Sequence, residues 1–475
     1  MSDKAVFTSG STMRHVVVMT LTSATGLMAL FLVDALNLLY ISLLGVTELA
    51  AAIGFAGAIQ FFMLSVSIGL MIAGVALVSR AIGAGERERA RAIAGASMAT
   101  TVLFLAVFAG IVWIFRDEAV GLLGAEGEAR RLAGDFLEIA LFSVPMLGIG
   151  MASSATLRAV GAARDAMFVT LTGGVVAAIL DPILIFVLDL RLTGAAISIV
   201  LTRCFIASFG FWLVARRHGM LAWPGLGGCA RDLPRIAKIA GPAMATQLST
   251  PFGMAYLTSV IAAWGDDAVA GWAVIGRITA LAFGGIFALA GAVGPIVGQN
   301  YGAGLYPRIA MAYRDALLFT AVYVLVAWFG LWLATGVVIS GFGLTGAGAE
   351  VVAAFTHIGA VGYLFAGFLF VSNAAFNNLG RPLWSTGFNW SRDGLVLPGL
   401  VAVAATAFGT ATAVYLQAGA NLMVGTAAAL VAWRLVHRIT GPEGEPMPMA
   451  VPAITSGRAA EAGVANPLAS GDQNR

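Results

Sequence analysis

The stretch "VVVMTLTSATGLMALFLVDALNLLYISLL" (residues 16–44) contains a single charged side chain, Asp34. An apolar run of about 20 residues is long enough to cross the hydrocarbon core of a bilayer as a helix. A charge inside such a span is costly to bury and is a candidate for function. The stretch therefore predicts a membrane-spanning helix in which Asp34 is the functional candidate.

The composition extends this prediction to the whole chain. Of 475 residues, 59% are hydrophobic and only 11% are charged, whereas soluble domains carry about 25% charged residues. The apolar runs are long and unbroken, without the alternation of a β-barrel. We therefore expect an all-α polytopic membrane protein.

Apolar runs between polar breaks predict twelve transmembrane helices, at residues 16–44, 50–79, 93–115, 133–157, 166–188, 192–215, 238–263, 270–298, 313–340, 350–376, 384–408 and 410–436. With the N-terminus in the cytoplasm, 18 Lys and Arg residues in loops or at the ends of spans fall on that side and four on the other (Arg116, Arg130, Arg131 and Arg191). Cytoplasmic loops are enriched in basic residues. We expect a multi-pass protein of the inner (plasma) membrane with both termini in the cytoplasm.

The chain also contains an internal repeat. "LVSRAIGAGERERA" follows the second span and "PIVGQNYGAGLYPRI" follows the eighth, which places Gly83-Ala84-Gly85 and Gly302-Ala303-Gly304 at an offset of 219. Gly161 and Gly380 repeat at the same offset. Repeated halves are a common plan for transporters. The repeat predicts two six-helix lobes, at residues 1–215 and 238–436, joined by a cytoplasmic linker loop at 216–237.

The residues after the last span are rich in Pro, Gly, Ala and Ser. Such a composition has little apolar surface to bury. We expect residues 437–475 to form a disordered cytoplasmic tail.

Signatures of an enzyme are missing from the sequence. It has no nucleophile elbow, P-loop or dinucleotide fingerprint. The four histidines are isolated from one another and from Cys204 and Cys229. We expect neither catalysis, nor a metal or cofactor, nor a structural disulfide.

Two acids lie at comparable depth in the first lobe. Asp34 precedes the outer end of its span by ten residues and Asp181 by seven, which corresponds to roughly 15 Å and 11 Å of helix. Two carboxylates in a dry site cannot easily both ionise, so they hold a proton or share a cation. This is the requirement for coupling to a proton or sodium gradient.

The repeat gives the second lobe no matching acids. The offset of 219 pairs Asp34 with Gly253, and alignment of Pro182 with Pro398 pairs Asp181 with Leu397. The ion site is therefore expected in the first lobe alone.

Three arginines also lie within spans. Arg203 is either the partner of Asp181 or a lock within the lobe, and Arg277 is a candidate for substrate contact. Arg392 and Asp393 are adjacent in sequence, so their side chains should point apart on a helix and find separate partners.

The substrate cavity needs uncharged side chains as well. Aromatic and methionine surfaces suit amphipathic or cationic ligands. The candidates for the cavity are Gln60, Phe62, Gln247, Tyr256, Arg203 and Arg277.

Over its twelve spans the chain resembles the multidrug and toxic compound extrusion (MATE) transporters. The resemblance rests on "VDALNLLYISLLGVTELAA", "LRAVGAARDAMFVTLTGGVVAAILDPILIFVLDLRLTGAAIS", "GPAMATQLS", "AVGPIVGQNYGAG" and "AFNNLGRPLW". It implies two six-helix lobes around a cavity and a secondary active antiporter. Such a protein exports drug-like compounds in exchange for protons or sodium by alternating access.

The sequence looks similar to the branch of DNA-damage-inducible proteins, whose ion site implies roles for particular residues. Asp34 and Asp181 match its two acids, Ala177 stands at its Asn position and Ser198 at its Thr position; Asn37 is a further neighbour of Asp34. The glutamate of another branch is replaced by Thr250. Sodium requires several oxygen ligands whereas a proton requires only a carboxylate, so Ala177 favours proton coupling.

Other functions remain as alternatives. A lipid-linked saccharide flippase of the same superfamily would use Arg203, Arg277 and Arg392 to meet phosphate. A receptor or scaffold gives no reason for two acids at one depth, and the loop signature of the major facilitator fold is absent. We expect small-molecule substrates and membrane lipids as partners, no nucleic acid, and a monomer.

Overall fold

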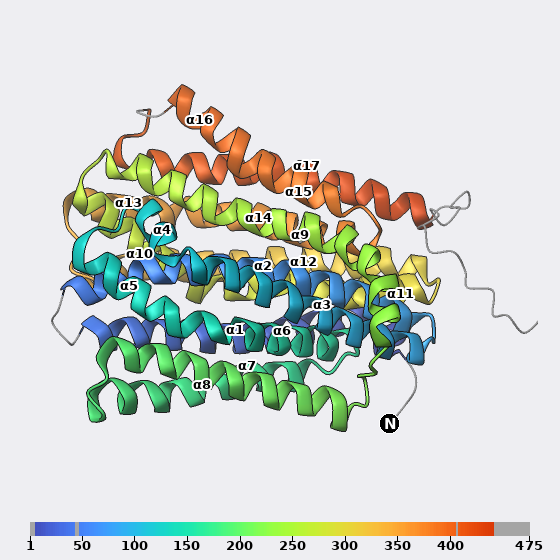
Figure 1. Cartoon of the computed structure of the whole chain (residues 1–475). Coiled ribbons are helices and arrows are strands. Elements are labelled where there is room, and N and C mark those ends of the chain that lie inside the picture. The colour runs from blue at the N-terminus through green and yellow to red at the C-terminus, as the bar shows by residue number, and fades with distance from the viewer. Residues whose placement is uncertain (1–4, 43–46, 405–406, 441–475) are drawn as a thin grey trace, which may run out of the picture.

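The computed structural model describes residues 5–42, 47–404 and 407–440, apart from some side chains near the end of the first helix, the start of the second and at Thr440. Within these residues the chain is helical and contains no strand. The helices run roughly along one direction and form a bundle (Figure 1). Both ends of the described chain lie at one end of this bundle, which we call the terminal end; the opposite end is the far end.

The first half of the chain contains the helices α1 (Thr12–Ser42), α2 (Thr47–Gly83), α3 (Arg87–Ile114), α4 (Arg116–Leu122), α5 (Gly127–Ala140), α6 (Val144–Ala159), α7 (Ala163–Pro182) and α8 (Arg191–Trp212). Short 3-10 or π turns adjoin them: η1 (Val6–Thr8), η2 (Leu141–Ser143), η3 (Ile183–Val187) and η4 (Leu213–Arg217).

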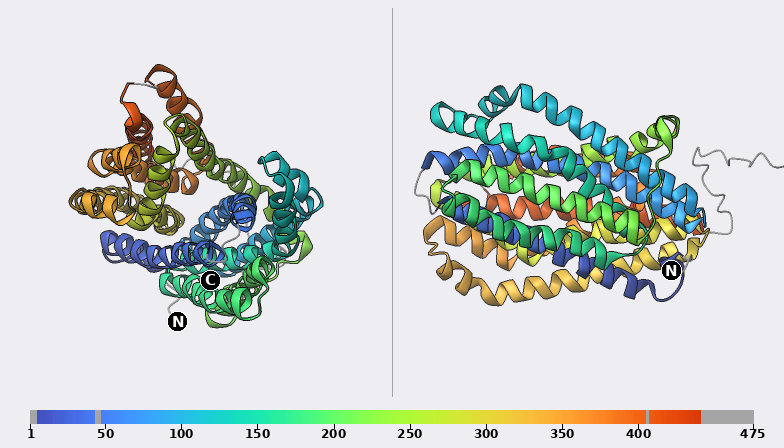
Figure 2. Two further views of the ribbon diagram at one scale, coloured as in Figure 1. Left: turned by 90° about the vertical axis from the view of Figure 1, so that its left-hand side faces the viewer. Right: turned by 60° about the horizontal axis from the view of Figure 1, so that its bottom comes forward.

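The second half contains α9 (Gly225–Ala262), α10 (Asp266–Ala282), α11 (Gly284–Gly302), α12 (Tyr306–Gly341), α13 (Gly346–His357), α14 (Gly362–Asn378), α15 (Pro382–Trp390), α16 (Leu397–Ala404) and α17 (Thr412–Thr440). Its short turns are η5 (Gly359–Val361), η6 (Ser391–Val396) and η7 (Gly409–Ala411). Figure 2 shows the two halves as neighbouring groups of helices, blue to green and yellow-green to red.

Each of the twelve predicted spans falls on one helix or on a consecutive group of helices. Eight helical segments of the described chain are long and apolar enough to cross a membrane on their own. The pair α10 and α11 makes one further candidate span, which is bent by 45°. This bend could not be predicted, because the apolar run 270–298 continues through it.

α9 begins at Gly225, well before the expected start of its span at residue 238, so the second half of the predicted linker loop is helical. Asp232 lies in this extension, is buried, and forms an ion pair with Arg89 of α3. A buried acid needs such a partner. The charges that suggested a loop therefore belong to a helix that packs on α3. The predicted tail lies outside the described residues from position 441 onward.

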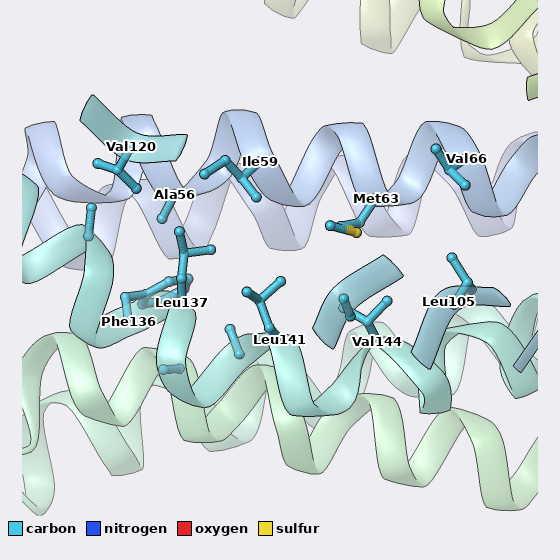
Figure 3. Close-up of a cluster of buried hydrophobic side chains, with 14 of the residues drawn as sticks. Ala56, Ile59, Met63, Val66, Leu105, Val120, Phe136, Leu137, Leu141 and Val144 are labelled. Atoms are coloured by element: carbon cyan, nitrogen blue, oxygen red, sulfur yellow. The ribbon is translucent and has the colours of Figure 1, made fainter. Parts of the chain in front are cut away.

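A large hydrophobic cluster holds the first lobe together. Figure 3 shows Ala56, Ile59, Met63 and Val66 on one face of α2, pointing toward α5, η2 and α6. Residues three and four apart share a face of a helix, so this row forms a continuous contact surface. The cluster packs α2 against α5 and thereby fixes the positions of the polar residues on these two helices.

Gly194 allows α8 to approach the turn η3. A Cβ atom added at this position would lie 2.5 Å from the carbonyl oxygen of Leu184. We predict that Gly194→Ala lowers the free energy of unfolding by about 1–3 kcal/mol, because such overpacking forces the backbone apart. Thermal unfolding of the purified protein in detergent measures this. Gly110→Ala, where nothing lies within 4 Å, serves as the control, and equal losses in both variants would contradict the prediction.

Candidate functional site

Asp181 lies in the last turn of α7, directly before Pro182 and the π-helical turn η3. Proline interrupts the hydrogen-bond ladder of a helix, and π turns often occur at functional sites. The Asp181 side chain is buried, with 1% of its surface exposed. A carboxylate is therefore held inside the first lobe at an irregular point of its helix.

Ser198 of α8 faces this carboxylate and is also fully buried. The Ser198 hydroxyl lies close enough to interact with the Asp181 carboxylate, but Asp181 Oδ2 and Ser198 Oγ form no hydrogen bond of normal length among the described residues. Nor does Thr202 Oγ1, one turn along α8. Buried polar groups in native proteins are nearly always satisfied. Asp181 and Ser198, on two adjacent helices, therefore form a buried polar site whose carboxylate can take up a proton or a small cation.

Asp34 and Asn37 belong to α1, but their side chains lie outside the described residues. The position of α1 is given by two contacts that flank them. Gly26 packs against Thr170 of α7, and the ring of Tyr40 lies 5.9 Å from that of Phe186 in η3. α1 and α7 therefore run parallel, and counting between these contacts brings the backbone of Asp34 level with the last turn of α7. A meeting of the Asp34 and Asp181 side chains stays a prediction.

Ala177 lies one turn before Asp181 and is buried. Its methyl group offers no oxygen to the site. The first-lobe site therefore has the oxygens of Asp181 and Ser198 but no amide at this position.

Arg203 of α8 connects three parts of the first lobe. It donates hydrogen bonds to Ser143 Oγ in η2 (2.9 Å) and to Gln60 Oε1 in α2 (3.0 Å). These bonds join α8 to α2 and η2 within the first lobe. Two predicted cavity residues, Gln60 and Arg203, are in direct contact.

The other predicted cavity residues are dispersed. Phe62 is 40% exposed, with its ring 5.7 Å from that of Phe108, and Tyr256 packs on the hydrophobic cluster of the second lobe. Gln247 is half-buried on α9 and Arg277 is exposed on α10. Among the described residues, no hydrogen bond or ion pair joins Gln247, Tyr256 and Arg277 to one another.

The expectation that Arg392 and Asp393 find separate partners is wrong. Arg392 donates from Nε to Asp393 Oδ1 and from Nη2 to Asp393 Oδ2, both at 2.7 Å. These residues lie in the π-helical turn η6, and the arginine side chain folds back onto the carboxylate of its sequence neighbour. Both are buried in the second lobe, where Asp393 packs against Gly253. The pair neutralises its own charge.

The described residues contain no group of three or more His, Cys, Asp or Glu side chains that could hold a metal ion. Cys204 and Cys229 are both free thiols.

Sequence reasoning passed over Arg80 and Gln299, which are buried and form hydrogen bonds to backbone carbonyl groups. Arg80 donates to the carbonyl oxygens of Asn377 and Asn378, and Gln299 Nε2 donates to that of Ala159. The repeat was the available signal, since positions 80 and 299 differ by the offset of 219.

A bundle of apolar spans with a repeated half and unsatisfied polar groups in a buried site defines a membrane transporter rather than an enzyme. The family model MatE matches residues 18–183 and 242–401, which is more than half of the chain. The chain therefore belongs to the MatE family.

Curated relatives agree with this assignment. Over 346 residues the chain is 27% identical to a protein of Shewanella oneidensis named FAD transporter, covering 70% of this chain and 76% of that one. Over 230 residues it is 25% identical to the multidrug export protein MepA of Staphylococcus aureus. That match covers 47% of this chain and half of MepA.

Solved structures share the fold. The chain matches the Vibrio cholerae MATE transporter VcmN with a TM-score of 0.84 at 24% identity, over 90% of this chain and 97% of that one. It matches a transporter of Pyrococcus furiosus, described as having a binding pocket of reverse polarity, with a TM-score of 0.85 at 20% identity, over 93% and 99%. These matches confirm the predicted fold of twelve transmembrane helices in two six-helix lobes.

The Arg392–Asp393 pair makes a prediction about stability. Arg392→Ala leaves the Asp393 carboxylate buried without its partner, and we expect a loss of about 3–5 kcal/mol of unfolding free energy. The double variant Arg392→Met with Asp393→Leu removes both charges and is expected to lose much less. Unfolding of the purified variants in mixed micelles measures both losses, and an equal loss in the single and double variants would refute the buried pair.

Proposed function

We propose that this protein is a secondary active antiporter, which exports amphipathic or cationic drug-like compounds in exchange for protons by alternating access. The observation that carries the proposal is the buried Asp181 carboxyl group, whose Oδ2 has no partner among the described residues. A buried carboxylate that lacks a partner is driven toward its protonated form. The protein can then bind the substrate and the proton alternately, each in competition with the other.

The donor set at this site favours a proton over sodium. Sodium needs several oxygen ligands to replace its water, and Ala177 supplies none at the turn before Asp181. Asp34 is proposed as the second carboxyl group of the site, with Ser198 beside Asp181 and Asn37 near Asp34. Proton coupling needs no further ligand.

The proposed cargo follows from the side chains of the first lobe and from a relative. Phe61 and Phe62 are exposed on α2, and aromatic faces attract cationic and amphipathic molecules. MepA is named a multidrug export protein. Gln247, Tyr256 and Arg277 are proposed as further contacts to substrate, whereas Gln60 and Arg203 are bonded to each other within the first lobe.

A second class of cargo is favoured by one residue and one relative. Arg277 is exposed within the span and makes no ion pair among the described residues, and the relative from Shewanella oneidensis is named a FAD transporter. An anionic, nucleotide-like substrate is therefore the second candidate. The flippase alternative is not favoured, because two of its three arginines, Arg203 and Arg392, are engaged within their own lobes.

We further propose that the protein is a monomer in the inner (plasma) membrane with both termini in the cytoplasm. The excess of basic residues at the terminal end supports this orientation. The lobe limits at 1–215 and 238–436 are part of the same proposal.

Exchange of substrate and protons predicts the behaviour of two acid variants. In vesicles that contain the purified protein, an imposed proton gradient should drive uptake of an ethidium-like dye. Asp181→Asn and Asp34→Asn should reduce it to the rate of protein-free vesicles, since an amide cannot take up and release the proton. Asp135→Asn, at an exposed acid, is the control. Transport at the wild-type rate in both site variants would rule out the coupling role.

The choice of ion predicts the effect of restoring an amide. Ala177→Asn adds an oxygen one turn before Asp181, and we expect a sodium gradient at constant pH to stimulate dye transport in this variant but not in the wild type. Ala177→Leu has a similar volume without the oxygen and should not respond to sodium. Sodium stimulation of the wild-type protein would overturn the preference for protons and leave the antiporter proposal in place.

A further inference from the structure

Two helices related by the repeat pack against each other at the interface of the lobes. α2 and α11 contain the two Gly-Ala-Gly motifs near their ends, at the offset of 219. A Cβ atom added at Gly294 would lie 3.7 Å from Val75, and one at Gly298 would meet Ser79. Val75 and Gly294, like Ser79 and Gly298, are separated by the same offset. Equivalent residues of the two lobes thus face each other along an approximate two-fold axis.

The same symmetry governs the backbone contacts at the terminal end. Gly83 packs against the carbonyl oxygen of Gln299, and Gly302 packs against that of Arg80. A Cβ atom at either glycine would lie 2.0 Å from that oxygen. Residues 80 and 299 are equivalent in the repeat, as are 83 and 302. The missing side chains allow the two helices to touch, as small residues do in membrane helix pairs.

The side chains at these equivalent positions cross the interface in opposite directions. Arg80 of the first lobe donates to the carbonyl oxygens of Asn377 (2.9 Å) and Asn378 (2.7 Å) of the second. Gln299 of the second lobe donates from Nε2 to the carbonyl oxygen of Ala159 of the first (2.7 Å). Ala159 and Asn378 are themselves separated by 219 residues.

The acceptors explain why the bonds form there. Ala159 and Asn378 are the last residues of α6 and α14, and the final carbonyl groups of a helix have no partner within it. Both donors are buried, Arg80 with 9% and Gln299 with 0% of their surface exposed. Each lobe thus satisfies the open helix end of the other, in a place that water does not reach.

The N-terminal segment covers the Gln299 half of this arrangement. The backbone N–H of Phe7 donates to Gln299 Oε1 (2.9 Å). Asn300 Nδ2 and Arg308 Nη2 both donate to the carbonyl oxygen of Phe7, at 3.1 Å each. Both polar atoms of the Gln299 side chain are therefore hydrogen-bonded to the first lobe. Oε1 accepts from the N-terminal segment, and Nε2 donates to Ala159 at the end of α6.

We propose that Arg80 and Gln299 are the two gating residues of the terminal end: their crossed hydrogen bonds hold the lobes together there, and both must break before that end can open. The inference rests on the proposed alternating access. Opening leaves buried donors and helix-end carbonyls without partners until water enters, which makes the closed gate a defined state rather than a loose contact.

The test measures access to a buried position in the closed gate. Ser79→Cys is introduced into the full chain in which Cys204 and Cys229 are replaced by Ser, because Ser79 is 0% exposed and lies beside Gly298. The rate of its reaction with a membrane-impermeant maleimide is compared in detergent for Arg80→Ala, Gln299→Ala and Arg80→Gln. The control is Arg164→Ala, at an exposed arginine of the first lobe.

Both alanine variants are expected to react about tenfold faster, which corresponds to about 1.4 kcal/mol. Arg80→Gln should stay slow, since glutamine performs this role at position 299, and Arg164→Ala should match the parent. Size-exclusion elution and the melting temperature show whether each variant is folded. Because Gln299→Ala retains the arginine, it tests the gate even if Arg80→Ala fails to fold.

Unchanged rates in both alanine variants would overturn the gate, and so would an Arg80→Gln rate as fast as that of Arg80→Ala. The readout needs neither substrate nor gradient. Faster labelling without proton-driven dye transport would therefore refute the proposed antiport and retain the gating residues. Normal transport with unchanged labelling would refute the gating residues and retain the antiport.

Discussion

A polar or charged side chain buried in a membrane-embedded bundle must find a partner or give up its charge, because no water is available to solvate it. The arginines of this protein meet the constraint in three ways. Arg392 pairs with an adjacent carboxylate, Arg203 bonds to a hydroxyl and an amide, and Arg80 bonds to the free carbonyls of a helix end. Asp181 has an oxygen for which the described residues provide no partner. Among the buried acids whose side chains the structure describes, Asp181 alone is left in this condition, and the proposed proton exchange is assigned to it.

The two lobes have equivalent helices, but the acidic residues inside them have different partners. The alignment of Pro182 with Pro398 pairs Ala177 with Asp393, so the second lobe has an acid where the first has a methyl group. Asp393 also packs against Gly253, the position equivalent to Asp34. Arg392 neutralises this acid in place. The repeat therefore supplies a symmetric frame and a symmetric gate, while an unpaired acid is proposed for the first lobe only.

Hydrophobic runs and the repeat were sufficient to predict the helices, because a span has to hide its backbone polar groups over a fixed length of about 20 residues. The same reasoning failed where a helical segment carries several charged residues. The segment 225–237 was read as a loop because it is charged, yet Asp232 is buried against Arg89. The pairing of Arg392 with Asp393 was missed because adjacent side chains on a helix were expected to diverge, whereas the arginine reaches its neighbour with two hydrogen bonds. Asp181 could be found from its isolation in an apolar run. For Gln299 the repeat marks the position, but its partner is a backbone carbonyl that any residue carries, so the bond itself could not be predicted.

Direct detection of protons tests the central claim that substrate and proton exchange at the first-lobe site. The purified protein in weakly buffered detergent solution is mixed with ethidium, and a pH indicator records protons released as dye binds. We predict release in the wild type and none in Asp181→Asn, with Asp135→Asn behaving as the wild type. Dye binding to the wild-type protein without any release of protons would contradict the account.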